Sequence, residues 1–391
     1  MQNLPLTLSE SQQLLCQVVA DSDNARRQES AQKLVQLLGD EAAYKMAAAN
    51  QVDPAMGHVL VDTLGVEQTP AHWHEAHAQV HRRLSAYLQE LDAIAMLLAD
   101  EGIPLVALKN GGIARGIYPC PGCCPMGDLD VLVEKRHFRR AHRLMLDAGY
   151  NFEFRSPLEE AELEEAEKGG GAEYWKMLPG GEKLWFELQW RPVAGRWIRP
   201  DQEPTAEELM ARSVAIEGTA VRLLAPEDNL LQVALHTAKH TYVRAPGFRL
   251  HTDVDRIARR QTINWQLFTE RVIKLQVKTA VYFSLAIPKM IFGTPIPDEV
   301  LRQIRPARWK EQLISRWLER AGIFNPDERK FSPPAYIAFT SLLYDDQSGL
   351  WRGVFPDRAW MHERYGFDND LLLPYYHVRR VANLVARRVN T

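Results

Sequence analysis

The chain has 391 residues, of which 46% are hydrophobic and 25% are charged, and its formal net charge is −3. This length allows two or three domains with a sizeable core. Because the charge is close to neutral, the composition argues against tight non-specific binding to nucleic acid, although it leaves room for a local basic groove.

The chain start and the cysteine content predict a cytoplasmic protein. The first residues, MQNLPLTLSESQQLL, lack the charged segment and apolar run of a secretory signal. No stretch of about 18 apolar residues predicts a membrane span. Four cysteines in a chain of this length do not make a disulfide framework.

Residues 1–100 are predicted to be helical. The segment SESQQLLCQVV (9–19) opens with a Ser/Glu capping pattern and continues with apolar residues at helical spacing. Residues 29–50 and 74–102 keep the same period, and the second of these segments ends at Gly102, a typical helix stop.

The pattern changes to alternating strands and helices between residues 101 and 205. A short apolar strand and a Gly-rich turn entering a helix come first, followed by a second strand, an amphipathic helix, a strand edge and an acidic helix. An aromatic hairpin with a Pro-Gly-Gly turn completes the region. These elements are expected at 103–109, 110–118, 128–134, 135–150, 151–156, 157–168 and 174–192. This order predicts a small α/β or α+β core.

Helices are expected again in the region 206–391. The segment PEDNLLQVALHTAKH (226–240) starts with proline and acidic residues, as helices often do. Further helices are predicted at 251–260, 264–276 and 279–292. The basic amphipathic segment 371–390 is interpreted as a docked surface helix in preference to a membrane-surface helix.

Three cysteines cluster in the segment YPCPGCCPMGD (118–128), namely Cys120, Cys123 and Cys124. Adjacent cysteines cannot easily join one tetrahedral site, and no second cysteine pair exists elsewhere in the sequence. A tight Pro/Gly turn with half-buried thiols is therefore the preferred interpretation over a structural zinc site.

Two aspartates occupy one face of a predicted strand in PMGDLDVLVEK (125–135). Side chains alternate across a strand, so Asp128 and Asp130 point to the same side. Such a pair can bind a hard cation such as Mg²⁺, can act as an acid/base dyad, or can lie on a solvated edge. The upstream Lys109, Gly111 and Gly112 favour the first option, because glycines between a strand and a helix let backbone amides approach a phosphate.

The segment LVALKNGGIARGIYPCPGCCPMGDLDVLV resembles the signature of the DNA polymerase β-type nucleotidyltransferase superfamily. Within it, the sequence looks most like the bacterial nucleotidyltransferase-like group. FELQWRP resembles that group's Glu-Leu-His-Trp strand, and LAPEDNLLQVALHTAKH and LHTDVDRIAR resemble the helices that follow it. The resemblance covers about residues 100–260. It implies a polymerase β-like core between helical N-terminal (1–100) and C-terminal (206–391) regions, a mixed α+β fold.

The resemblance also implies a reaction and its residues. Enzymes of this superfamily use three carboxylates around Mg²⁺ ions to move a nucleoside monophosphate from an NTP, here expected to be ATP, to a hydroxyl. Asp128 and Asp130 correspond to the first two ligands and Glu187 to the third. Glu187 as an edge residue facing water remains an alternative.

Further pocket residues are expected around this centre. Lys109 could hold a phosphate or lie at a solvated strand end. His236, Lys239 and His240 share a helix, and we expect polar contacts in the substrate pocket, or satisfied core histidines, in preference to a metal site. Asp253 is a further pocket candidate through the resemblance.

Three positions depart from the family pattern. Asn110 replaces the glycine of Lys-Gly, Cys124 replaces an arginine before Pro-x-Gly-Asp, and Gln189 replaces the histidine of Glu-Leu-His-Trp. If the arginine of the family pattern binds phosphate, Arg115 or Arg191 could take over that role from Cys124.

The preferred function is Mg²⁺-dependent NMP transfer to a small-molecule or peptide/protein hydroxyl, with nucleic acid disfavoured as acceptor. A phosphotransferase on the same fold and a degenerate nucleotide-binding or scaffold protein are the alternatives. The three departures favour the degenerate protein.

Overall fold

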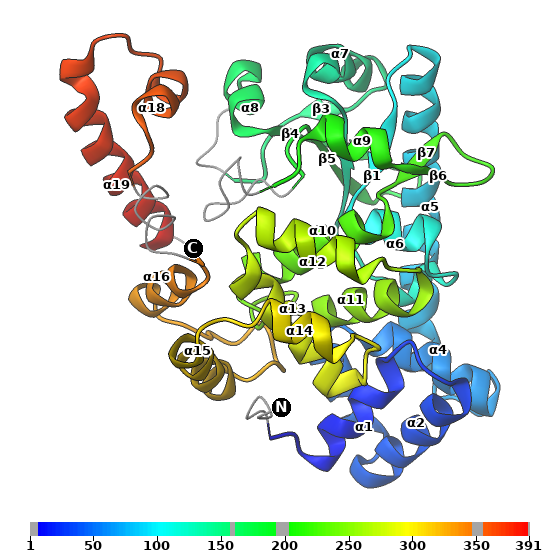
Figure 1. Cartoon of the computed structure of the whole chain (residues 1–391). Helices are drawn as coiled ribbons and strands as arrows, with labels where there is room; N and C mark the ends of the chain where they lie inside the picture. The colour runs from blue at the N-terminus through cyan, green and yellow to red at the C-terminus, as the bar shows by residue number, and fades with distance from the viewer. Residues whose placement is uncertain (1–6, 157–160, 193–202, 346–354, 390–391) are drawn as a thin grey trace.

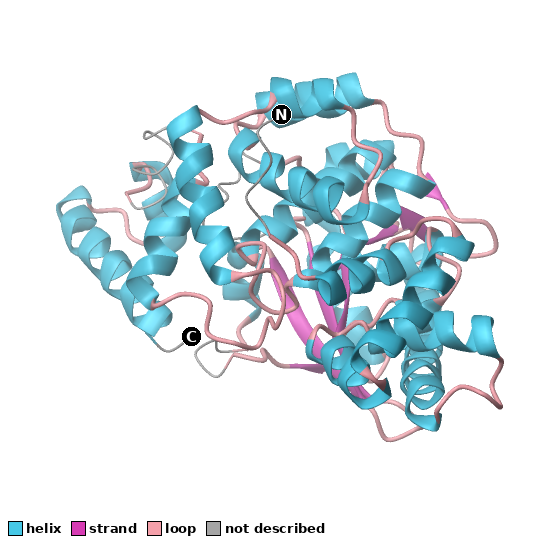
Figure 2. Ribbon diagram, turned by 90° about the horizontal axis from the view of Figure 1, so that it is seen from below, coloured by secondary structure: helices cyan, strands magenta, loops and turns pink. Residues whose placement is uncertain are grey.

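The computed structural model describes residues 7–156, 161–192, 203–345 and 355–389. Helices from both halves of the chain surround one mixed β-sheet, as Figures 1 and 2 show. The mixed α+β fold class predicted from the sequence is therefore confirmed.

In the described part of the chain, from residue 7 on, five helices precede the first strand, in line with the helical character predicted for residues 1–100. The first begins with a capping box, in which the Ser9 side chain accepts a hydrogen bond from the Gln12 backbone and the Gln12 side chain accepts one from the Ser9 backbone. The fifth helix runs from this N-terminal group along the sheet (Figure 1), and its Tyr87 donates to the Lys183 carbonyl over 3.2 Å. The five helices are α1 (Glu10–Val19), α2 (Asn24–Leu38), α3 (Asp40–Ala49), α4 (Asp53–Leu64) and α5 (Ala71–Asp100).

The seven strands of the sheet lie in the order β3-β4-β5-β2-β1-β7-β6. The central β2 runs parallel to β5 and antiparallel to β1, and β1 runs parallel to β7. The strands are β1 (Leu105–Ala107), β2 (Asp128–Leu132), β3 (Asn151–Phe152), β4 (Gly171–Met177), β5 (Lys183–Gln189), β6 (Val214–Ala215) and β7 (Val221–Leu223).

The two faces of the sheet are packed differently. Leu129, Val131 and Phe186 belong to the main hydrophobic core, which continues into the N-terminal helices. Val106 and Leu132 project from the opposite face into a small separate core with the helix α9 (Ala206–Arg212). This second face also carries the polar side chains of β2, so the carboxylates lie beside a compact apolar patch.

Helices between and after the strands complete the fold. Those interleaved with the strands are α6 (Lys109–Gly116), α7 (Phe138–Asp147) and α8 (Leu163–Gly169), with short 3₁₀ segments η1 (Pro121–Cys123) and η2 (Lys135–His137). The later helices are α10 (Pro226–Lys239), α11 (Phe248–Arg260), α12 (Trp265–Lys274), α13 (Lys278–Phe292), α14 (Asp298–Gln303), α15 (Arg308–Ala321), α16 (Pro333–Leu342), α18 (Arg358–Tyr365) and α19 (Leu373–Val389), with η4 (Asp370–Leu372).

The region after residue 205 is not entirely helical, and this corrects the sequence interpretation. Strands β6 and β7 follow α9, and β7 pairs with β1. The sheet therefore extends past the predicted core boundary at residue 205. Strands of two and three residues carry too little alternation to be recognised in a sequence.

Two further predicted helices correspond to α8 and α19. Residues 157–160 of the predicted acidic helix lie outside the described residues, and the described part of that segment forms α8. The predicted basic C-terminal helix is α19. It packs on α18, where Arg380 lies over Trp360, and on the segment that follows α18, where Tyr376 stacks on Phe367 with 4.3 Å between ring centroids. Among the helices of the described segments, none has the length and apolar character needed to cross a membrane.

Candidate active site

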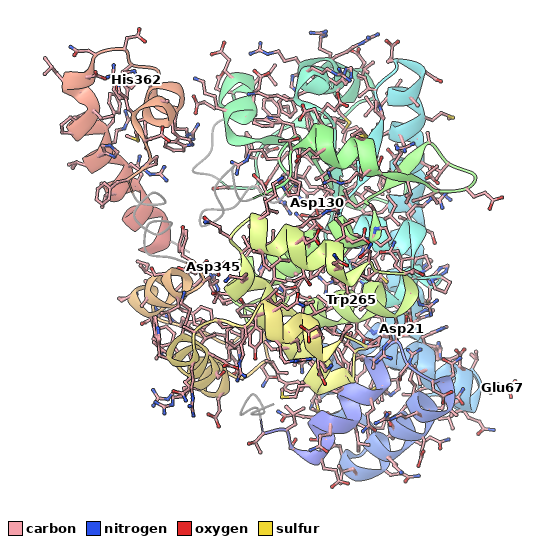
Figure 3. All side chains as sticks on the ribbon, viewed as in Figure 1. Asp21, Glu67, Asp130, Trp265, Asp345 and His362 are labelled. Atoms are coloured by element: carbon pink, nitrogen blue, oxygen red, sulfur yellow. The ribbon has the colours of Figure 1, made fainter. Side chains whose placement is uncertain are left out.

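Three carboxylates lie together on one face of the sheet. Asp128 and Asp130 occupy alternate positions of β2, and the parallel pairing with β5 places Asp130 directly beside Glu187. One oxygen from each of these residues lies within 4.8 Å of the others. The structure thus brings together the three residues that the resemblance implied as metal ligands, and Figure 3 places Asp130 near the centre of the molecule.

Two cations neutralise these carboxylates. The Lys109 Nζ lies 2.5 Å from Asp130 Oδ1 and 4.0 Å from Glu187 Oε2. The Arg155 guanidinium lies 2.6 Å from Asp128 and 4.0 Å from Glu187. Lys109, the first residue of α6, has a φ of +50°, a conformation that L-residues other than asparagine and aspartate seldom adopt. Lys109 thus combines this unusual backbone conformation with an ammonium group that contacts the carboxylates.

Burial and neighbouring charges together raise the pKa values of Asp128, Asp130 and Lys109. The pKa of Asp130 is raised to about 6. Burial is the largest cause, the charge of Lys109 lowers the pKa, and the charge of Glu187 raises it. Burial and the charge of Asp130 also raise the pKa of Asp128, with Arg155 acting against them. Burial by itself would lower the pKa of Lys109, but the charges of Asp130 and Glu187 outweigh it, so the net shift is upward. Lys109 is therefore a fixed positive charge at neutral pH.

Two members of the site were missed in the sequence. Glu173 on β4 pairs with Glu187 across the hairpin, so it adds a fourth carboxylate to the same row. Arg155 binds Glu173 through its backbone N–H at 2.7 Å as well as through its side chain. The Pro-Gly-Gly turn fixes the hairpin register, and this signal could have identified Glu173; Arg155, in the segment after β3, had no such signal.

The two glycines after Lys109 lie inside α6, not in an open turn as the sequence suggested. At Gly112 a Cβ would meet the Ala107 carbonyl oxygen at 2.9 Å and the Leu223 side chain at 3.0 Å, so this glycine permits the close packing of α6 on β1 and β7. At Gly111 the nearest atom would be 3.6 Å away, on Leu129. The first-turn backbone N–H groups of α6 keep the anion-binding character of a helix N-terminus.

Asn110 connects α6 to α11. With its amide oriented to satisfy both neighbours, Asn110 donates to Asp253 at 2.7 Å and accepts from Arg249 at 2.9 Å. Asp253 also lies 3.5 Å from Arg256, and its pKa is raised by burial. Asp253 therefore belongs to a buried charge network behind Lys109; it is not among the three clustered carboxylates.

The last turn of α10 and the residue that caps it carry two neutral histidines, and the charge of Lys109 acts on both. The ring centroids of His236 and His240 lie 4.8 Å apart. Burial, together with the charges of Lys109 and of His240, lowers the pKa of His236 well below its ordinary value. Burial, followed by the charge of Lys239, lowers the pKa of His240 to about 4. Both imidazoles are thus uncharged at neutral pH, as suits polar contacts with a substrate.

The residues that depart from the family pattern, and the arginines named as substitutes, have defined partners in the structure. The Gln189 side chain donates to Asp130 Oδ1 at 2.9 Å, so this residue orients a candidate ligand. Arg115 is paired with Asp92 on α5, and Arg191 with Glu203. The arginine charges that act on the Cys124 thiol come from Arg256 and Arg249 of α11. Sequence reasoning named Arg115 and Arg191 as substitutes and missed these two arginines.

The donor set suits a hard divalent cation. Carboxylate oxygens from two adjacent strands form an anionic row that is balanced by an ammonium and a guanidinium. Mg²⁺ prefers oxygen ligands and is commonly held by one or two protein carboxylates together with substrate phosphates. The same row next to a helix N-terminus can accommodate a metal-bound triphosphate.

Comparison with known proteins identifies the family of the chain. A family model described as an uncharacterised nucleotidyltransferase matches residues 38–293, more than half of the sequence. The matched segment contains β1 to β7, α6, α10 and α11, and therefore all residues of the site described above. No curated protein and no solved structure matches the chain.

Proposed function

Because the chain belongs to the family of uncharacterised nucleotidyltransferases, we propose that it transfers a nucleoside monophosphate from an NTP to an acceptor hydroxyl in a Mg²⁺-dependent reaction. The observation that carries the proposal is the β2–β5 register, which sets Glu187 beside Asp130 and on the same face as Asp128. ATP is the proposed donor, and a small molecule or a peptide or protein side chain is the proposed acceptor.

Asp128, Asp130 and Glu187 are the residues that would hold Mg²⁺. When bound, the metal would neutralise charge on the triphosphate and lower the pKa of the acceptor hydroxyl. Asp130, which contacts Lys109 at the start of α6, and Asp128 on the same strand face would serve mainly the nucleotide. Glu187, which lies 4.0 Å from both cations, serves mainly the acceptor side.

The chain's own cations would bind the phosphates. Lys109 is the first residue of α6 and contacts Asp130, and a bound phosphate would replace part of this contact. The Arg249 guanidinium reaches Asn110, the next residue of α6. We propose that Arg249 supplies the positive charge that the family pattern places at Cys124.

Two alternative functions would use the same site. A phosphotransferase would present the γ-phosphate to the acceptor and release ADP. A nucleotide-binding protein without turnover is favoured by one observation, namely that Lys109 and Arg155 already neutralise Asp130 and Asp128.

The decisive experiment incubates the protein with each NTP, Mg²⁺ and a panel of candidate acceptors, and measures the intact mass of each acceptor. A gain of one nucleotide with release of pyrophosphate supports the proposal. A gain of one phosphate with release of ADP assigns the phosphotransferase, and binding of NTP without either product assigns the non-catalytic protein. Asp130→Asn should abolish the gain, whereas Asp147→Asn, on the exposed end of α7, should leave it unchanged.

A further inference from the structure

A second cluster of metal-ligating side chains lies away from the carboxylates. His58 on α4, His77 on α5, and Cys120 and Cys123 around η1 each offer one ligand atom, and the four atoms lie within 4.8 Å of one another. Cys123 is buried and the other three are partly buried. The two cysteines belong to the Pro/Gly turn that the sequence marked, but the histidines come from helices about 40 to 60 residues upstream.

The side chains of the cluster already contact one another. The His77 Nε2 lies 3.2 Å from the Cys120 sulfur, and the Cys120 and Cys123 sulfurs lie 3.2 Å apart. The His58 and His77 rings stack with 4.8 Å between centroids. Two imidazoles and two thiols thus converge on one small volume.

The backbone around the cysteines is shaped for this convergence. A Cβ at Gly122 would lie only 2.5 Å from His77 Nε2, so the glycine gives the imidazole its place against the turn. The turn is closed by the Cys123 N–H donating to the Cys120 carbonyl, and Arg256 donates to the Cys123 carbonyl over 2.8 Å. The position of the cysteines is therefore held from both sides.

An acidic residue lies beside one histidine, as is common around metals. The His58 Nε2 lies 3.5 Å from the Asp62 carboxylate, one turn further along α4. Histidines that ligate a metal usually give their other ring nitrogen to a carboxylate or carbonyl, which fixes the ring orientation.

We propose that His58, His77, Cys120 and Cys123 form a tetrahedral Zn²⁺ site that joins α4 and α5 to the segment leading into β2. Two imidazoles and two thiolates are a typical closed set for structural zinc, whereas Mg²⁺ prefers oxygen ligands. Zinc binds both cysteines as thiolates, so binding releases to solvent any proton that their sulfurs still carry. Cys124 stays outside the site, because adjacent cysteines do not share one tetrahedron easily.

The place of the site explains what it would do. Residues 117–127 connect α6, which carries Lys109, to β2, which begins at Asp128. Zinc would fasten this connection to two helices of the N-terminal region. The site is thus a structural support for the carboxylates and takes no part in the reaction itself.

The first test uses the wild-type protein, reduced and freed of metal and then dialysed against Zn²⁺ or Co²⁺. We expect one-to-one binding, and for Co²⁺ the intense visible absorption of a tetrahedral centre with sulfur-to-cobalt charge transfer. Failure to bind Zn²⁺ under these reducing conditions, or a cobalt spectrum without sulfur ligation, overturns the proposal.

The second test compares matched variants by metal analysis. His77→Asn and Cys120→Ser should lose the zinc, and Asp62→Asn should weaken zinc binding about tenfold or more, as removal of an orienting partner does. His74→Asn on the same helix and Cys124→Ser in the same turn should keep it. Zinc that survives in Cys120→Ser but is lost in Asp130→Asn would place the metal at the carboxylates and overturn the proposal. These measurements are independent of the proposed transferase activity, so the two can fail separately.

Discussion

The ion pair between Lys109 and Asp130 allows a quantitative prediction about stability. Both side chains are nearly buried, with exposed fractions of 14% and 6%, and their charged atoms lie 2.5 Å apart. Removing one partner of a buried pair leaves an uncompensated charge, which typically costs about 3–5 kcal/mol. If only the repulsion between the Asp128 and Asp130 carboxylates counted, removal of one of them would be stabilising. The raised pKa of Asp130 shows that burial of its charge is costly, but the same charge compensates the buried Lys109 ammonium at 2.5 Å. Because Asp130→Asn removes this compensation, we predict the opposite sign.

The size of the effect follows from the neighbours. After Asp130→Asn, Glu187 still lies 4.0 Å from Lys109 and compensates part of its charge, and repulsion between Asp130 and Asp128 is removed. We therefore expect a loss of about 2 kcal/mol, below the usual range for a broken buried pair. Lys109→Met leaves three carboxylates with less compensation, so it should cost more, about 3–5 kcal/mol.

The assay is a double-mutant cycle in which unfolding by urea is monitored through tryptophan fluorescence, in buffer without Mg²⁺. The double variant should lose less than the sum of the single variants, with a coupling energy of about 2 kcal/mol. Glu41→Gln, which breaks an exposed pair with Lys45 on α3, is the control and should cost no more than about 0.5 kcal/mol. An Asp130→Asn protein as stable as the wild type, or more stable, would refute the reasoning, because repulsion among the carboxylates would then exceed their attraction to Lys109.

Three further predictions address the site and the helices around it. Glu187→Gln should bind NTP with near-normal affinity but lose turnover by about a hundredfold or more, because a charge needed mainly in the transition state is removed. Comparison of kcat and NTP affinity with Asp130→Asn checks this, and full activity would point to Glu173, which lies beside Glu187, as the third carboxylate. Gly112→Ala should destabilise the protein by about 1–3 kcal/mol through overlap with the Ala107 carbonyl, whereas Gly111→Ala, whose Cβ would only reach ordinary contact with Leu129, should spare stability; equal melting temperatures for the two variants would contradict this. His251 donates from Nε2 to the Tyr242 carbonyl at 2.9 Å, and burial lowers its pKa to about 4 from an ordinary value of 6.5. Its contribution to stability is thus complete above pH 6.5 and is lost as the pH falls from 6.5 to 4, by at most about 3 kcal/mol. His251→Gln should flatten the pH dependence of urea unfolding in that window, and an unchanged profile would show that His251 is not the group responsible.

How far the sequence predicts this molecule depends on the distance between interacting residues. The strand β2 and the β4–β5 hairpin were predicted because alternation and a Pro-Gly-Gly turn are local signals. The common face of Asp128 and Asp130 followed from strand geometry alone. Their proximity to Glu187 could be predicted only from the family resemblance, because no single segment of the sequence determines the order of strands in a sheet.

Other contacts had no local signal. Arg155 reaches Asp128 from a segment whose own pattern is that of a strand edge. His58 and His77 lie on helices with ordinary periodicity, so a search for a second cysteine pair could not find the histidines that face Cys120. Strand β7 is recognisable only through its pairing with β1, which joins distant parts of the chain.

The pairing of β1 with β7 also has a consequence for the synthesis of the chain. Leu105 lies opposite Val221, which the ribosome adds 116 residues later. At about 5–20 residues per second, β1 waits on the order of ten seconds for this neighbour during synthesis. Until then one edge of an apolar strand has unpaired backbone groups, which is the kind of surface that recruits chaperones or other chains. We therefore expect production of the intact protein to depend on how the nascent chain is protected while residues 108–220 are made.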